Sequence, residues 1–166
     1  MKPTLSIALL LIAATPAFAA DPEGCDKFKW PMDKEIALLT APSLPKLAAG
    51  VETPAAPVAV TMTLSPIAEA VLPKPPERRQ KRDSYAGFVR GRVPAAGLYV
   101  VTISEYGWID VLQNDAYLKS NSFGGVTGCA GVRKSVRYDL SAGPVTIQVS
   151  GAAKNTINLA FSPASH

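Results

Sequence analysis

Apolar and polar residues alternate one by one in several short segments between residues 58 and 163. In VAVTMTL (58–64), Val58, Val60, Met62 and Leu64 fall on one side, and smaller or polar residues fall on the other. Such alternation predicts β-strands that bury one face and expose the other to water. The pattern recurs in LYVVTIS (98–104), WIDVLQ (108–113), VRKSVRYDL (132–140), VTIQVS (145–150) and TINLAF (156–161).

Turn-forming residues separate these segments. Asn114 and Asp115 lie between two apolar segments and tolerate a positive φ, so they predict a two-residue hairpin turn. Further turn signals occur at 94–97, 106–107 and 141–144. Seven or eight short strands at such spacing predict an all-β fold over residues 58–163, an antiparallel β-sandwich of the jelly-roll type.

The N-terminus departs from this pattern and predicts export. Lys2 is followed by the apolar run LSIALLLIAA (5–14) and by the small-x-small site AFA (17–19). These are the features of a secretory signal peptide, which we place at residues 1–20. The apolar run is shorter than the roughly 20 residues of a transmembrane helix. We therefore expect a periplasmic or secreted protein without a transmembrane segment.

Cys25 and Cys129 are the two cysteines of the chain. In an oxidising compartment an even number of cysteines favours a disulfide, and two cysteines allow a single intramolecular pairing. A bond that closes a loop of about 100 residues contributes about 4.7 kcal/mol in the chain-entropy model. The alternatives are a free thiol or a metal site, but two distant cysteines without a nearby histidine do not make a four-ligand zinc site. We predict that Cys129 holds the N-terminal segment against the domain.

Residues 21–57 form an N-terminal extension of different composition. Asp33 is a candidate N-cap for a helix of at most two turns in KEIALLTA (34–41), which ends before Pro42. Phe28 and Trp30 lie close to Cys25 and are suited to pack on the domain there. The proline- and alanine-rich segment 42–57 predicts an extended connector.

The segment LPKPPERRQKRDS (72–84) interrupts the strands with three prolines and a basic run at 78–82. Its prolines exclude a central strand, so we expect a mobile, solvated loop. The alternative is an electrostatic patch for an anionic polymer or a lipid head group. The formal net charge of +4 is compatible with an anionic partner and equally with an ordinary positive surface.

Two stretches carry a resemblance to a known family. VPAAGLY (93–99) and LSAGPV (140–145) each place a glycine-containing turn before a strand. These positions resemble the turns of the bacterial pre-peptidase C-terminal domains, over about residues 58–162. The chain also resembles small exported proteobacterial proteins without an assigned function, some of which carry a homogentisate 1,2-dioxygenase label. The resemblance implies a jelly-roll sandwich and, by analogy, a stabilising role toward another exported protein.

The histidine count limits the chemistry that this chain can perform. Its single histidine is the last residue, His166. Non-haem iron dioxygenation needs about two histidines and a carboxylate, so we interpret a dioxygenase label as a mistaken transfer. A Ser-His-Asp triad needs an internal histidine, which the chain lacks. The glycine-rich segment 124–131 lies between strand-like segments, whereas a phosphate-binding loop joins a strand to a helix. We predict no catalytic residue, metal or cofactor.

Tyr106 and Trp108 are the first candidates for ligand binding. If Ile109 and Val111 face the core, the alternation sends Trp108 outward, where it would contact a sugar or a protein together with Tyr106. The plainer interpretation is that Trp108 packs in the core with the opposite register, or that the N-terminal segment covers it.

Four arginines are the second candidates. Arg133 and Arg137 alternate with the inward-facing Val136, Tyr138 and Leu140, and therefore point outward. Together with two arginines of FVRGRV (88–93) they would form a basic stripe for carboxylate or phosphate groups. The plainer interpretation is surface charge that discourages edge-to-edge pairing. The stripe consists of Arg90, Arg92, Arg133 and Arg137.

We therefore expect an exported, non-catalytic binding or accessory module whose ligand is an anionic glycan of the cell envelope. Nucleic acid is not expected as a partner outside the cytoplasm. The alternative is a structural or stabilising partner of another envelope protein, which rests on fold analogy alone. An enzyme is the third hypothesis, because a pair of carboxylates suffices for some hydrolases, but no spacing in the chain singles out two.

Overall fold

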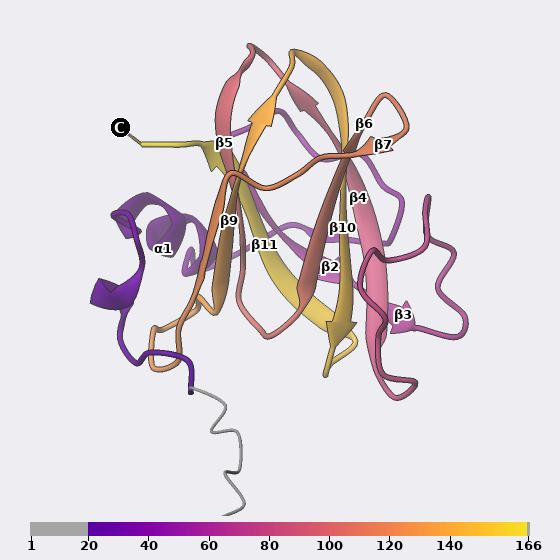
Figure 1. Cartoon of the computed structure of the whole chain (residues 1–166), viewed down its shortest axis with the longest axis horizontal. Coiled ribbons are helices and arrows are strands. Elements are labelled where there is room, and N and C mark those ends of the chain that lie inside the picture. The colour runs from indigo at the N-terminus through magenta and orange to yellow at the C-terminus, as the bar shows by residue number, and fades with distance from the viewer. Residues whose placement is uncertain (1–19, 166) are drawn as a thin grey trace, which may run out of the picture.

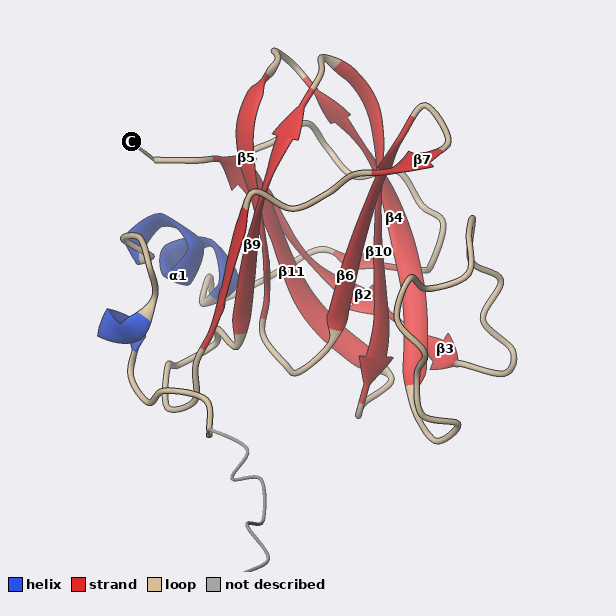
Figure 2. Cartoon of the chain, in the orientation of Figure 1, coloured by secondary structure: helices blue, strands red, loops and turns tan. Residues whose placement is uncertain are grey.

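The computed structural model describes residues 20–165, which form two β-sheets packed face to face (Figures 1 and 2). Most of the predicted signal peptide and His166 lie outside the described residues. One sheet has six strands in the order β1 (Lys46–Leu47), β2 (Val58–Thr63), β11 (Thr156–Pro163), β5 (Gly97–Ile103), β9 (Lys134–Leu140) and β8 (Ser122–Gly125). The other has five, in the order β3 (Ser65–Pro66), β4 (Tyr85–Val93), β10 (Gly143–Ala152), β6 (Trp108–Gln113) and β7 (Ala116–Tyr117).

All neighbouring strands are antiparallel except β1 and β2, which pair in parallel. The prediction of an all-β, antiparallel sandwich is confirmed, and the jelly-roll assignment stays a prediction. Within the described part of the chain, no helix has the length and apolar character needed to cross a membrane.

The core lies between the two sheets, on the faces that the alternation predicts. In β2 and its neighbour β11, Val60 pairs with Leu159 and Met62 pairs with Ile157, and all four side chains are at most 2% exposed. Each fully buried side chain of this kind contributes about 1.5–3 kcal/mol relative to an exposed one. The other long strands add their predicted inward residues to the same core: Tyr99, Val101, Ile103, Ile109, Val111, Val136, Tyr138, Leu140, Val145, Ile147 and Val149.

The predicted two-residue hairpin joins β6 to β7. Asn114 and Asp115 both adopt a positive φ, 50° and 59°, and their neighbours Gln113 and Ala116 are paired. A turn with two left-handed residues matches the twist of the flanking strands, and asparagine and aspartate adopt that conformation more readily than most residues. The hairpin is therefore confirmed.

The N-terminal extension covers the outer face of the six-stranded sheet (Figure 1). It contains a short 3-10 turn, η1 (Cys25–Lys27), and the predicted helix, α1 (Asp33–Leu39). The prediction of Asp33 as N-cap is wrong by one residue, because Met32 is the N-cap and no side chain caps the helix. As the first helical residue, Asp33 still places its charge at the positive end of the helix dipole.

The extension is attached to the domain near Cys25 and again at α1. The predicted disulfide between Cys25 and Cys129 is confirmed, with the two Cα atoms 4.8 Å apart. Beside it, the N–H of Thr127 donates to the carbonyl of Pro22 at 2.9 Å. Further along the extension, the buried Glu35 of α1 accepts a 2.9 Å hydrogen bond from the hydroxyl of Ser162.

The proline- and alanine-rich connector passes from one sheet to the other. Its residues Lys46 and Leu47 pair with β2 as the edge strand β1. Further along, the N–H of Thr53 donates to the carbonyl of Arg90 in β4 at 2.7 Å. The extended conformation that the composition predicts is thus used to pair with β2 of one sheet and with β4 of the other.

The basic segment 72–84 contains no strand, as its prolines predict. It lies against the outer face of the five-stranded sheet, where the N–H of Glu77 donates to the carboxylate of Asp110 in β6 at 3.4 Å. The hydroxyl of Tyr117 in β7 also donates to the carbonyl of Pro75. Figure 1 shows this segment and the N-terminal extension on opposite sides of the molecule. The loop is therefore solvated along most of its basic run, as expected, and in addition it covers part of a sheet.

Candidate functional site

Three of the six predicted ligand-binding residues line one surface hollow of about 360 Å³. Tyr106 lies in the β5–β6 loop, Trp108 begins β6, and Arg133 immediately precedes β9. The hollow opens where β6 of one sheet faces β8 and β9 of the other, because inward-facing residues of these strands form its floor. We call this site the cationic hollow, and the side chains that matter for its chemistry are Arg78, Tyr106, Trp108, Phe123, Arg133 and Lys134.

Trp108 faces outward, as predicted, but its ring is not free. The ammonium of Lys134 lies 4.5 Å from the ring centroid, and the guanidinium of Arg78 lies 5.4 Å from it. The indole N–H donates to Asp110 at 2.6 Å. Contacts of this kind hold the indole in place and bring two positive charges next to it. Trp108 therefore organises the hollow, and the expectation that it offers a free stacking surface is corrected.

Tyr106 and Phe123 provide the exposed aromatic surface. Each side chain is 60% exposed, and each has a cation near its ring, Arg133 at 5.7 Å from Tyr106 and Lys29 at 5.3 Å from Phe123. Large exposed rings at the edge of a polar hollow are typical of contact surfaces for ligands or partners. Phe123 was not predicted as a site residue, and the signal that could have identified it is an aromatic residue in the small-residue context SFGG.

Arg133 already holds a carboxylate. Its guanidinium donates to Asp21 at 2.5 Å and to the carbonyl of Val126 at 2.9 Å. The Asp21 side chain is 51% exposed and that of Arg133 is 21% exposed, so this ion pair is accessible to water. Arginine binds carboxylates well because its planar fork of N–H donors matches their two oxygens. The hollow thus contains one carboxylate, which the chain itself supplies.

Lys134 is the least expected member of the site. In β9, Lys134 lies two residues before the buried Val136 and four before the buried Tyr138. The alternation of the strand therefore places this lysine on the inward face. Its ammonium donates to the carbonyl of Gly107 at 3.2 Å. Burial, followed by the nearby charge of Arg78, lowers the pKa of Lys134. A charged residue at an inward position was the signal that could have identified Lys134.

A buried polar layer lies behind the cationic hollow. Asp110 is 2% exposed and accepts hydrogen bonds from Trp108 and, at 3.5 Å, from the side-chain amide of Gln148. Burial raises the pKa of Asp110. Gln148 and Ser150 of β10 are fully buried, and the Oε1 and Oγ atoms respectively have no hydrogen-bond partner. The alternation predicts a wet face for these residues, and the structure corrects this because segment 72–84 covers them.

The other three predicted arginines lie elsewhere. Arg137 stacks on Trp30 at 4.3 Å beneath the N-terminal extension. Arg90 of β4 stacks on Phe88 and donates to the carbonyl of Gly50 at 2.7 Å, and Arg92 is exposed on the same strand. Since β4 and β9 belong to different sheets, the four arginines do not form one stripe.

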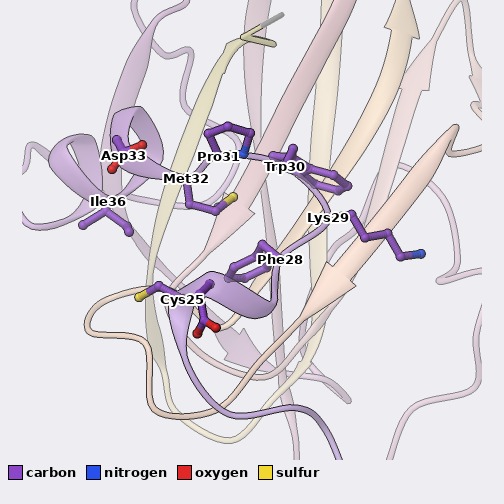
Figure 3. Close-up of a pocket in the computed structure, with 9 residues that line it drawn as sticks. Cys25, Phe28, Lys29, Trp30, Pro31, Met32, Asp33 and Ile36 are labelled. Atoms are coloured by element: carbon purple, nitrogen blue, oxygen red, sulfur yellow. The ribbon is translucent and has the colours of Figure 1, made fainter.

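The extension has a hollow of its own, of about 430 Å³ (Figure 3). Its walls come from one continuous segment, residues 25–36. Figure 3 shows the ring of Phe28 and the thioether of Met32 within this segment, while Lys29 points away from them. Both Phe28 and Met32 are buried in the apolar layer against the sheet, so this hollow is a feature of the packing and offers no group of convergent charges.

Metal binding receives no support from the arrangement of ligands. In the part of the chain that the structure describes, no group of three or more His, Cys, Asp or Glu side chains is placed to hold an ion. Asp110 bonds to Trp108, while Asp115 at the hairpin pairs with Lys74 at 3.4 Å.

Comparison of the chain with protein-family models, with curated proteins and with solved structures finds no match. The resemblance to the pre-peptidase C-terminal domains therefore stays a prediction, and the site is interpreted from its own geometry.

Proposed function

We propose that this protein is an exported, non-catalytic binding module that engages a carboxylate-bearing glycan through the cationic hollow. The observation that carries the proposal is the meeting of three cations, Arg78, Arg133 and Lys134, with two exposed rings in one hollow. Hydrogen bonds from charged donors to carboxylates are among the strongest polar contacts available to a protein. Aromatic rings offer a flat apolar surface on which the apolar face of a sugar ring packs.

Two further features support this class of ligand. The Asp21 carboxylate on Arg133 serves as an internal example of the group that the hollow would bind. Lys134 is partly desolvated and lies near Arg78, which lowers its pKa, and an incoming anion would relieve this unfavourable environment. The disulfide supports export, because disulfides persist in oxidising compartments.

The direct test is calorimetric titration of the oxidised protein with polygalacturonate, a linear glycan with one carboxylate on each sugar. Dextran, a neutral glucan, tests the need for charge, and polyglutamate tests the need for sugar rings. We expect saturable binding of polygalacturonate. Dextran should bind at least about tenfold more weakly, since charge-assisted hydrogen bonds contribute about 1.5–3 kcal/mol each. Polyglutamate keeps the carboxylates but should also bind more weakly, because it offers no sugar face to the exposed rings.

A matched pair of double variants locates the site. Arg133→Gln/Lys134→Gln removes two charges from the hollow, and Arg90→Gln/Arg92→Gln removes two charges from β4. The first is expected to weaken polygalacturonate binding by at least about tenfold, and the second by no more than about twofold. Equal losses in both variants, absence of binding, or equal binding of polyglutamate would overturn the proposal.

A further inference from the structure

A second hollow adjoins the cationic hollow. It measures about 350 Å³ and shares three of its lining residues, Arg78, Tyr106 and Trp108, with the cationic hollow. Its other walls come from residues 79–84 of the basic segment and from residues 151–153 at the end of β10. The two hollows therefore lie on either side of one shared partition.

The second hollow is also positively charged. Arg79 and Lys81 line it together with Arg78, and Asp83 is the only acidic residue among its lining residues. Arg79 and Lys81 are exposed, so their charges are available to a ligand. Positive charge thus continues from Arg133 and Lys134, past the aromatic partition, to the basic segment.

The basic segment is held in a defined conformation beside this hollow. The Ser84 hydroxyl donates to the Lys81 carbonyl at 2.6 Å, and the Gln80 amide donates to the Arg78 carbonyl at 2.7 Å. Gly151 has a φ of +74°, and a Cβ atom at this position would lie 2.1 Å from the Gln80 side chain. The positive φ favours glycine at this position, and a larger residue would also force the Gln80 side chain to move. Charges on an ordered segment bind with a smaller entropy loss than charges on a free arm.

We infer that the two hollows form one groove for a linear polyanionic glycan, which crosses Tyr106 and Trp108 and presents anionic groups to both ends. The inference rests on the proposed function and specifies its ligand as a chain of several sugars. A chain that occupies both hollows gains affinity because its second contact is intramolecular. A short fragment would occupy one hollow only.

The test compares digalacturonate with hexagalacturonate by calorimetry on the oxidised protein. We expect the hexamer to bind at least about tenfold more tightly than the dimer. In Arg79→Gln/Lys81→Gln, hexamer affinity should fall to within about threefold of dimer affinity, and dimer affinity should change by less than about twofold. The control, Arg90→Gln/Arg92→Gln, removes the same charge outside the groove and should retain the full preference for the hexamer.

The outcomes separate this inference from the proposed function. If both fragments bind with similar affinity, or if the two double variants behave alike, the extended groove is refuted while binding at the cationic hollow stands. If neither fragment nor the polymer binds, the proposed function fails as well. Thermal unfolding of each variant shows whether a loss of binding reflects loss of the fold, which we do not expect for exposed side chains.

Discussion

The outer faces of the two sheets are both covered by chain segments, but the covers differ in chemistry. The N-terminal extension places Phe28, Trp30 and Met32 on the six-stranded sheet, each at most 8% exposed, and a disulfide secures it. Segment 72–84 lies on the five-stranded sheet over Asp110, Gln148 and other polar groups, and part of it remains open. The first cover completes an apolar layer, and the second leaves open the two adjoining hollows that share Arg78, Tyr106 and Trp108.

The two tryptophans illustrate the same difference. Trp30 stacks with Arg137 and lies in the apolar layer, where its N–H has no partner. Trp108 is flanked by Lys134 and Arg78, and its N–H bonds to Asp110. A cation beside a tryptophan is thus not by itself a sign of a binding site. What distinguishes Trp108 is that two cations flank its ring, that its N–H bonds to a buried carboxylate, and that it lines both surface hollows.

The strongest test of this comparison is removal of the disulfide. Cys25→Ser/Cys129→Ser is expected to lower the free energy of unfolding by about 3–5 kcal/mol, because the bond closes a long loop. The bond joins residues 104 positions apart and attaches the whole apolar cover. Urea denaturation of the variant and the oxidised wild type measures the difference. A loss below about 1 kcal/mol would mean that apolar packing alone secures the extension.

The second largest expected effect concerns Asp110, one of the polar groups that segment 72–84 covers. Asp110→Ala should lower the free energy of unfolding by about 1–3 kcal/mol at pH 7, because it leaves the buried N–H of Trp108 and the amide of Gln148 without an acceptor. Asp110→Asn should lose less stability than Asp110→Ala at that pH. Its oxygen still accepts from Trp108, and its amide can donate to Gln148 Oε1, which has no partner in the wild type. The amide cannot accept from the N–H of Glu77 as the carboxylate does.

The wild type and Asp110→Asn should also differ in how their stability depends on pH. Burial raises the pKa of Asp110 above its ordinary value of 3.8, so the folded state takes up a proton before the unfolded state does. As the pH falls through the raised pKa toward 3.8, the wild type should gain stability relative to Asp110→Asn. Urea denaturation of both proteins from pH 7 to pH 4 measures this difference. A constant difference would contradict the buried, partly desolvated state of the carboxyl.

The smallest expected effect concerns Asp21. Asp21→Asn breaks an exposed ion pair, so the free energy of unfolding should change by less than about 0.5 kcal/mol. If the hollow binds carboxylates, polygalacturonate affinity should rise by about two- to fivefold, because Arg133 no longer has an internal partner. Calorimetry measures the change. A fall in affinity would mean that Asp21 contributes to the ligand site and does not compete with it.

Several residues of the cationic hollow could be predicted from the sequence, but the full set of residues that meet there could not. Trp108 and Arg133 were identified from alternation, which is a local property of a strand, and Tyr106 was identified from its position beside Trp108. Arg78 comes from a loop and Asp21 from the extension, and no local pattern relates either of them to β6 or β9. The proposed stripe of four arginines failed for the same reason, since alternation gives the side of a strand but not the sheet to which it belongs.

The sequence by itself determined the long strands, their buried faces, the Asn114–Asp115 hairpin and the Cys25–Cys129 pairing. These depend on interactions between residues near in sequence, or on there being only one possible partner. Only the tertiary structure decided which outward faces remain wet. Gln148 and Ser135 alternate as solvent-facing residues do, yet both are fully buried. Burial of an outer face depends on which distant segment lies over it, and the pattern within a strand contains no information about that segment.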